Sequence, residues 1–192
     1  MRLTNQEIMN TTDQKWSKVY DGGKDFRPLF PVDLERIFAL LPPDQKKQHL
    51  DIGCGTGGLT RDLFHRGHTS TGIDPSSSAI ERAQAATAYL DRGINYICED
   101  FESVTLYEGP YSLITCKLVY AFLQDKKKCV EKMSNLLSPD GTLILVTKIH
   151  HSDEDATPIS VDGREVRSTL GQSFSEVREL DLEWATCFIC RK

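Results

Sequence analysis

Apolar and polar positions change their spacing along the chain in a way that predicts strands and helices in turn from residue 48 onward. Short apolar runs typical of strands occur at 49–52, 69–73, 94–98, 111–116 and 142–147. Apolar residues recur at helical spacing over 59–65, 75–90 and 126–137. Two further runs, 177–184 and 186–189, are joined too closely to pair as anything but antiparallel strands. This order predicts the α/β class: a Rossmann-like, doubly wound sheet of seven strands, mostly parallel with an antiparallel last strand, and helices on both faces.

Local signals refine the expected boundaries. A helix over about 32–41 should end at Pro42-Pro43. In the helix over 75–90, Pro75 suits the first turn, and Ser78 and Glu81 have the spacing of a capping box. Ser138-Pro-Asp-Gly141 predicts a turn, and the polar stretch 150–171 predicts a loop-rich segment. We expect one domain overall, with 1–47 as an N-terminal helical or lid segment and 48–192 as the ligand-binding domain.

Composition narrows the classes of partner. A net charge of −5 gives no broad basic field for a nucleic acid, so we expect no nucleic-acid partner. The first residues lack a secretory apolar core and no run approaches the roughly 20 apolar residues that span a bilayer, which favours a cytoplasmic protein without a membrane partner. The six cysteines sit mostly in apolar runs and are expected to be reduced. Cys187 and Cys190 have the spacing of a metal or redox pair, but residues i and i+3 of a strand face opposite sides.

One glycine-rich segment carries the strongest functional signal. Leu50-Asp-Ile-Gly-Cys-Gly-Thr-Gly-Gly58 follows a predicted strand and opens a predicted helix, the arrangement in which a backbone turns tightly against a ligand. Asp74 ends the next strand, where a carboxylate can accept hydrogen bonds from a ribose diol. Gly53, Gly55 and Gly58 also satisfy the dinucleotide fingerprint. From these residues alone, a nicotinamide-dependent dehydrogenase therefore stays open.

From Gln48 to Lys192 the sequence resembles the class I S-adenosylmethionine-dependent methyltransferases of the small-molecule type. Leu50-Asp-Ile-Gly-Cys-Gly-Thr-Gly57 resembles the first motif of that family, whose early acid the dinucleotide fingerprint does not require. Asp74 resembles the ribose-binding acid, and Asp100 and Phe101 resemble the adenine site. Leu136-Leu-Ser-Pro-Asp-Gly141 and the closing hairpin resemble the turn into strand five and strands six and seven.

The resemblance implies that residues 48–192 form a methyltransferase domain with S-adenosylmethionine as its cofactor. The implied cofactor-binding residues are Asp51, Gly53, Cys54, Gly55, Thr56, Gly57, Asp74, Pro75, Asp100, Phe101 and Cys116. The implied acceptor is a small molecule with an oxygen, nitrogen or sulfur nucleophile. Relatives that methylate amino groups of nucleic-acid bases carry an Asn/Asp-Pro-Pro-aromatic run after strand four, where this chain has Cys116-Lys-Leu-Val119. A non-catalytic cofactor-binding subunit stays open as a second alternative.

Candidates for the chemistry follow the predicted strands four and five. A methyl bound to a cationic sulfur needs an aligned nucleophile, and a base only when the acceptor carries a proton. Lys117, Tyr120 and His150 are the titratable candidates for that base. The run His150-His-Ser-Asp-Glu-Asp155 could suit a divalent metal, but metal-dependent relatives place a carboxylate after strand four, where this chain has Thr115-Cys116-Lys117, so we expect no metal.

Aromatic residues gather before the first strand. Trp16, Tyr20, Phe26 and Arg27 lie in a segment that resembles the region closing over cofactor and acceptor in small-molecule relatives. An aromatic lid would exclude water from the reacting sulfur, and we expect Tyr20 to contact the cofactor. Simple packing of Trp16 and Tyr20 on the sheet edge stays open as the alternative.

Overall fold

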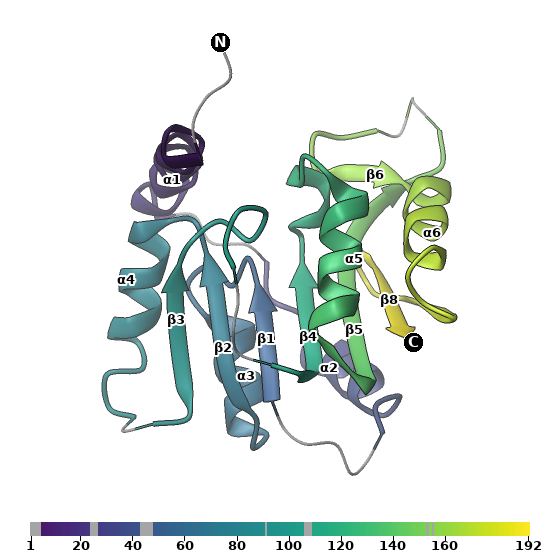
Figure 1. Ribbon diagram of the computed structural model, residues 1–192, viewed down its shortest axis with the longest axis horizontal. Helices are drawn as coiled ribbons and strands as arrows, with labels where there is room; N and C mark the ends of the chain where they lie inside the picture. Colours follow the sequence, from purple (N-terminus) through teal and green to yellow (C-terminus); the bar gives the residue numbers. More distant parts are fainter. Residues whose placement is uncertain are drawn as a thin grey trace. The chain divides into compact units, whose positions relative to one another are not determined.

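The structure is a computed structural model that describes residues 5–23, 27–42, 48–90, 92–105, 109–152, 154 and 156–192, with side chains from residue 13 onward. The helices are α1 (Asn5–Asp21), α2 (Pro31–Phe38), α3 (Gly58–His65), α4 (Ser77–Ala85), the short 3₁₀ helix η1 (Tyr120–Phe122), α5 (Lys126–Leu136) and α6 (Gly163–Gly171) (Figure 1). The strands are β1 (Gln48–Ile52), β2 (Thr69–Asp74), β3 (Ile94–Cys98), β4 (Tyr111–Lys117), β5 (Leu137–His150), β6 (Ser160–Asp162), β7 (Glu176–Asp181) and β8 (Thr186–Arg191). Two compact units result, one of residues 1–28 with 49–107 and one of 29–48 with 108–192.

The first unit is built on the strand order β3-β2-β1. β2 and β3 run parallel, with Ser70 opposite Ile94 and Asp74 opposite Cys98. The strands are apolar because helices α3 and α4 pack on β2 and β3, and Ile52, Leu63 and Ile73 are almost completely buried. The parallel register ends β2 at Asp74, so the carboxylate expected to bind ligand lies at the carboxyl edge of the sheet.

The second unit has the strand order β4-β5-β8-β7. β4 and β5 are parallel, whereas β8 is antiparallel to both β5 and β7, which confirms the predicted closing hairpin. The expected turn at 138–141 is a bulge: Tyr111 pairs with Leu137 but Leu113 pairs with Thr142. The α/β class and the mostly parallel sheet with its antiparallel end are therefore confirmed.

Helices cover both faces of the sheet in the second unit. Along β8 successive side chains alternate between faces, and all four residues of Cys187–Cys190 are buried. Arg191, which shares a face with Cys187, donates to the Leu40 carbonyl just after α2, so α2 covers that face, and α5 lies on the other (Figure 1). Burial raises the pKa of Cys187 to about 12 and raises that of Cys190 as well. Both thiols are therefore buried in an apolar strand and protonated at neutral pH.

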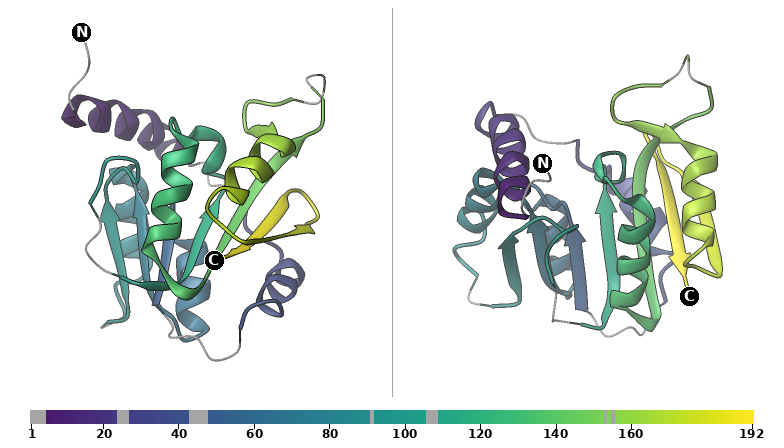
Figure 2. Two further views of the ribbon diagram at one scale, coloured as in Figure 1. Left: turned by 45° about the vertical axis from the view of Figure 1, so that its right-hand side comes forward. Right: turned by 45° about the horizontal axis from the view of Figure 1, so that its top comes forward.

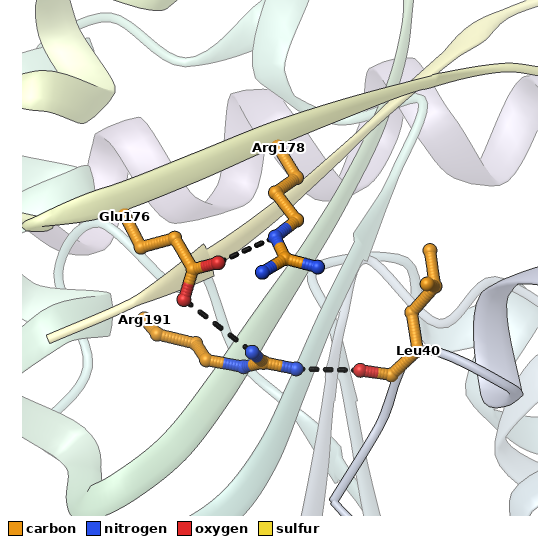
Figure 3. A network of polar contacts seen from close by, with 4 residues as sticks. All are labelled: Leu40, Glu176, Arg178 and Arg191. Atoms are coloured by element: carbon orange, nitrogen blue, oxygen red, sulfur yellow. Dashed lines mark hydrogen bonds and ion pairs between the residues drawn. The ribbon is translucent and has the colours of Figure 1, made fainter.

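An arginine network fixes the end of α2 to the last two strands (Figure 3). The Glu176 carboxylate accepts from Arg178 Nε and, at 3.3 Å, from Arg191 Nη1. The other terminal nitrogen of Arg191 donates to the Leu40 carbonyl. Leu40 lies two residues after the end of α2, so this bond ties the chain just beyond α2 to β8.

Two local expectations were wrong. Residues 150–171 are not loop-rich throughout, because β6 pairs with the end of β5 and α6 follows it. The helix after β2 begins at Ser77, with Pro75 outside it, and the Ser76 side chain accepts from the Ala79 N–H in place of the predicted Ser78 and Glu81 box. Within the segment 1–47, expected to be helical or a lid, the bounds of the 17-residue helix α1 were not predicted, because its polar sequence has no continuous apolar face. None of the described helices combines the length and apolarity needed to cross a membrane.

Candidate functional site

The glycine loop follows β1 and has a left-handed glycine at each of three alternate positions. Gly53, Gly55 and Gly57 have φ values of 66°, 54° and 76°, a region in which other residues are strained. The loop is tied to β2, since the N–H groups of Gly53 and Cys54 both donate to the Ile73 carbonyl, at 2.8 and 3.1 Å. The loop therefore holds its shape by backbone bonds, as a preformed cradle requires.

Gly55 lies against a residue of α1. A methyl group added at residue 55 would lie 2.6 Å from the hydroxyl oxygen of Tyr20, which is 5% exposed. No such side chain fits without displacing Tyr20. The structure thus brings Tyr20 to the glycine loop, where the sequence predicted it, although a contact with cofactor stays a prediction.

Gly57 is required by packing within the unit. A methyl group at residue 57 would collide with the Tyr96 hydroxyl and lie 2.8 Å from two of its ring carbons. Gly72 of β2 leaves room for the same ring on another side, because a methyl group added at residue 72 would lie 2.9 Å from Tyr96 Cδ1. At Gly58, by contrast, a methyl group would meet none of the described atoms within 4 Å. The close approach therefore depends on Gly57 rather than on Gly58, the third glycine of the dinucleotide fingerprint.

Asp74 is a buried carboxylate held by two backbone N–H groups. Its Oδ2 accepts from the Gly55 N–H and its Oδ1 from the Ser76 N–H, each at 2.9 Å. Burial raises its pKa to about 6, even though these two bonds lower it, and the nearby Asp51 and Asp100 raise it further. Each oxygen keeps a second lone pair, so the fixed carboxylate can accept two hydroxyl groups side by side.

The other residues of the implied cofactor set surround this loop. Asp51 is buried and accepts from the Thr60 hydroxyl at 2.6 Å, which orients it from α3. The Thr56 carbonyl accepts from Arg61 at 2.6 Å. Burial, with the nearby Asp51 and Asp74, raises the pKa of the Cys54 thiol well above its usual value. Cys54 therefore packs as a neutral thiol, with its sulfur donating to the Gly55 carbonyl.

The expected adenine site follows β3. One oxygen of Asp100 accepts from the Glu102 N–H at 2.9 Å and so fixes the turn that begins at residue 101. Phe101 is 4% exposed, and the carbonyl of Pro75 accepts weakly from the Cys98 thiol at 3.9 Å. Asp100, Phe101 and Pro75 thus belong to the same unit as the glycine loop and Asp74.

The remaining predicted residues lie in the second unit. Cys116 is fully buried in β4, and Lys117 ends that strand half-buried. Leu118, directly after it, has a φ of 60°, which is strained for a leucine. Tyr120 is fully buried, and burial raises its pKa. Tyr120 is consequently a core residue of its unit rather than a side chain at the rim.

His150 has an orienting partner. Its Nδ1 lies 3.0 Å from the Ser160 hydroxyl, which also accepts from the Thr157 N–H at 2.7 Å and donates to the Thr157 carbonyl at 3.1 Å. When the Ser160 hydroxyl donates its one proton to Thr157, it accepts from His150 Nδ1. This arrangement fits a proton on Nδ1 and leaves a lone pair on Nε2.

Other predictions fall outside what is described. Phe26 lies outside the described residues, as do Asp153 and Asp155 of the acidic run. Among the residues that are described, no three His, Cys, Asp or Glu side chains are grouped so as to hold a metal ion.

Sequence reasoning missed several residues that build the site. None of them belongs to the motif. Ser76 donates its N–H to Asp74, Tyr96 packs against Gly57, and Arg61 donates to the Thr56 carbonyl of the loop. Ser76 could have been found, since a serine before an apolar helix pattern is a helix-cap signal.

Known proteins match this chain in sequence and in structure. The family described as "Methyltransferase domain" matches residues 50–145. A ubiquinone biosynthesis O-methyltransferase from Coxiella burnetii is 33% identical over 147 residues, covering 76% of this chain and 62% of the relative. A protein of the same name from Actinobacillus pleuropneumoniae is 28% identical over 155 residues, 72% of this chain and 66% of the relative. This chain thus spans less than two thirds of the length of both relatives.

Solved structures confirm the fold. A S-adenosylmethionine-dependent methyltransferase from Aquifex aeolicus matches with a TM-score of 0.68 at 15% identity, over 98% of both chains. A second, from Mesorhizobium loti, matches with a TM-score of 0.67 at 18% identity, over 84% of this chain and 98% of that one. At such identities the likeness establishes a shared fold.

Proposed function

Because this chain belongs to the methyltransferase-domain family, we propose that it is an enzyme that uses S-adenosylmethionine to methylate a hydroxyl group of a small organic molecule. The observation that carries the proposal is the Asp74 carboxylate, fixed by two backbone N–H groups at the glycine loop. The oxygen acceptor is supported by the relatives named as O-methyltransferases of ubiquinone biosynthesis.

The residues present fit S-adenosylmethionine better than a dinucleotide. The lone pairs left on Asp74 suit a ribose diol, but both ligands carry one, so the distinction between them rests on the third glycine. The dinucleotide fingerprint needs its third glycine for close helix packing, and Gly58 has no described neighbour that requires one. Asp51, Gly53, Cys54, Gly55, Thr56, Gly57, Asp74, Pro75, Asp100, Phe101, Cys116 and Tyr20 are the residues that we propose to hold the cofactor.

The bound cofactor would supply a methyl group on a cationic sulfur, so the protein has to bind and align the acceptor and remove its proton. We propose His150 as that base, because its orienting bond to Ser160 leaves Nε2 able to accept a proton. Tyr120 is buried and its pKa is raised, so it stays protonated at neutral pH and cannot accept the proton. Lys117 is kept as the alternative.

The base assignment has a direct test. His150→Gln should lower kcat for a phenolic acceptor by roughly 10²- to 10⁴-fold, the usual contribution of a general base, with KM for the cofactor unchanged. His151→Gln is the matched control, because it changes the exposed neighbouring histidine. Equal activity of the His150→Gln variant and the wild type would remove His150 from the mechanism.

Thermal unfolding with two ligands tests the cofactor itself. S-adenosylhomocysteine at a hundred times its dissociation constant should stabilise the protein by about 2.7 kcal/mol, whereas NADH should have no effect. The opposite result would favour a dehydrogenase. Methyl transfer to a panel of phenols, amines and thiols then separates an enzyme from a non-catalytic subunit, which would bind the ligand and methylate nothing.

The remaining expectations are proposals of the same kind. The net charge of −5 supports a small-molecule acceptor over a nucleic acid. The cytoplasmic location stays a prediction.

A further inference from the structure

Helix α1 makes a series of polar contacts with its unit. Of its side chains from residue 13 to 21, Tyr20 alone is buried, and Gln14, Lys15, Lys18 and Asp21 are exposed. The helix lies across the N-terminal end of α4 in all views (Figures 1 and 2). Because Tyr20 is the only buried side chain among these described residues, hydrogen bonds contribute to the position of this part of α1.

Those bonds form a ladder between two short sets of residues, here called the α1 latch: Asp13, Ser17 and Asp21 of α1, and Ser76, Ser77 and Ser78 at the start of α4. Asp13, Ser17 and Asp21 are four residues apart and therefore share one face of α1. Asp13 Oδ1 accepts from the Ser77 N–H at 2.9 Å, from the Ser77 hydroxyl at 3.0 Å and from the Ser17 hydroxyl at 2.7 Å. The hydroxyls of Ser17 and Ser76 lie 2.9 Å apart, and Asp21 accepts from the Ser78 hydroxyl.

The latch caps α4 from another helix. The first N–H groups of a helix have no partner within it. Here the Ser77 N–H donates to Asp13 and the Ser78 N–H donates to Ser17 at 3.4 Å, while the Ala79 N–H donates to the local cap Ser76. A carboxylate at this end also meets the positive end of the α4 dipole. The bond from the Ser77 N–H is the main reason that the pKa of Asp13 lies below its usual value.

Residues of both helices in the latch region also lead to the proposed cofactor site. Ser76, which contacts Ser17, also donates its N–H to Asp74 at 2.9 Å. On α1, Tyr20 is one turn beyond Ser17, and its carbonyl accepts from Arg82 of α4 at 3.3 Å. The latch therefore links Tyr20, which lies against Gly55, to Asp74, the carboxylate expected to bind ribose.

We infer that Asp13 is a positioning residue, which fixes α1 on α4 so that Tyr20 closes over the glycine loop and couples the docking of α1 to cofactor binding. The inference rests on the proposed function for the identity of that ligand. Coupling is reciprocal, so whatever factor docking adds to the affinity, ligand binding must add to docking.

Amide hydrogen exchange on the full chain tests the latch itself. In Asp13→Ala the Ser77 amide should exchange at least about tenfold faster than in the wild type, because its acceptor is gone. The Ala79 amide, which donates to Ser76, should change by less than about twofold and serves as the internal control. Gln14→Ala, an exposed substitution on the neighbouring position, should change neither amide. An unchanged Ser77 amide in Asp13→Ala would overturn the inference.

Calorimetric titration with S-adenosylhomocysteine tests the coupling. Asp13→Ala should weaken binding about tenfold, and Asp13→Asn, which keeps one acceptor oxygen, about threefold. The ligand should slow exchange of the α1 amides in the wild type by the same factor. If Asp13→Ala does not fold, the Asp13→Asn result decides alone.

Two negative outcomes are distinct. A wild type that binds no S-adenosylhomocysteine would contradict the proposed function. Normal binding by the wild type together with equal affinity in Asp13→Ala and Asp13→Asn would overturn the positioning role and leave the proposed function standing.

Discussion

The surroundings of Asp74 disfavour the ionised form of its side chain. Burial and two neighbouring carboxylates raise its pKa to about 6, while the N–H groups of Ser76 and Gly55 oppose that rise. A raised pKa means that ionised Asp74 costs folding energy at neutral pH. A ligand that donates two hydrogen bonds to the ionised form would recover part of that cost, which is how a binding site differs from a simple structural contact.

The affinity for S-adenosylhomocysteine should therefore depend on pH through Asp74. Binding favours the carboxylate, so the affinity should be constant above about pH 7 and fall about tenfold per unit as the pH drops below the pKa of about 6. Isothermal titration between pH 5 and 8 measures this. In Asp74→Asn the affinity should be lower and flat over that range. A wild-type affinity that is equally flat would refute the assignment.

Two adjacent glycines should respond in opposite ways to the same substitution. Gly57→Ala should destabilise the protein by about 2 to 4 kcal/mol, because it adds left-handed strain to a collision with Tyr96. Gly58→Ala meets none of the described atoms and should be neutral or stabilising by up to about 1 kcal/mol. Urea unfolding of both variants measures the difference. Equal effects would contradict the packing role of Gly57.

At the scale of elements, the Arg191 network is a test of how α2 is anchored. Arg191→Ala should destabilise the protein by about 1 to 2 kcal/mol, since the half-buried Leu40, just after α2, loses the donor to its carbonyl. Arg178→Ala is the matched control, because Arg178 is 57% exposed and contacts the same Glu176 at the surface. Chemical denaturation should show no measurable loss for Arg178→Ala. If both variants lose the same stability, the anchor at Leu40 contributes nothing.

Elements that are marked by a local sequence pattern were predictable. Elements that depend on contacts with distant residues were missed or lacked bounds. β3 was placed at its observed bounds because an apolar run bounded by polar residues needs no partner to be recognised. The bounds and position of helix α1, within the expected helical or lid segment, escaped prediction because its partners are serine hydroxyls and a backbone N–H of a segment about 60 residues away. The same limit applies within the site. The glycine motif and Asp74 were found, but the packing of Tyr96 on Gly57 depends on a strand that the motif does not include.

At the scale of the whole molecule, a buried histidine should control stability in mild acid. Burial, with the nearby His68, lowers the pKa of His49 to about 3 from 6.5, and its Nδ1 bonds to Ser70 at 3.1 Å. Below pH 6.5 the unfolded chain binds a proton that the folded chain refuses, so stability falls as the pH falls. Asp74 acts in the opposite sense between about pH 4 and 6, so the His49 effect must be isolated by substitution.

The stability of the wild type relative to His49→Asn should therefore shrink by about 2 kcal/mol between pH 7 and pH 5, at about 1.4 kcal/mol per unit below 6.5. Urea unfolding at the two pH values provides the four free energies needed. The exposed His65→Asn serves as the control, and its difference from the wild type should not change. A constant difference for His49→Asn would mean that His49 is protonated in the folded protein.

Titration of the wild type and Asp74→Ala with S-adenosylhomocysteine at pH 7.5 tests the proposed function most directly. We expect one site per chain in the wild type. We expect an affinity roughly 10- to 100-fold lower in Asp74→Ala, the loss typical of hydrogen bonds to a charged group. Absence of binding to the wild type, or equal affinity in a folded Asp74→Ala variant, would contradict it.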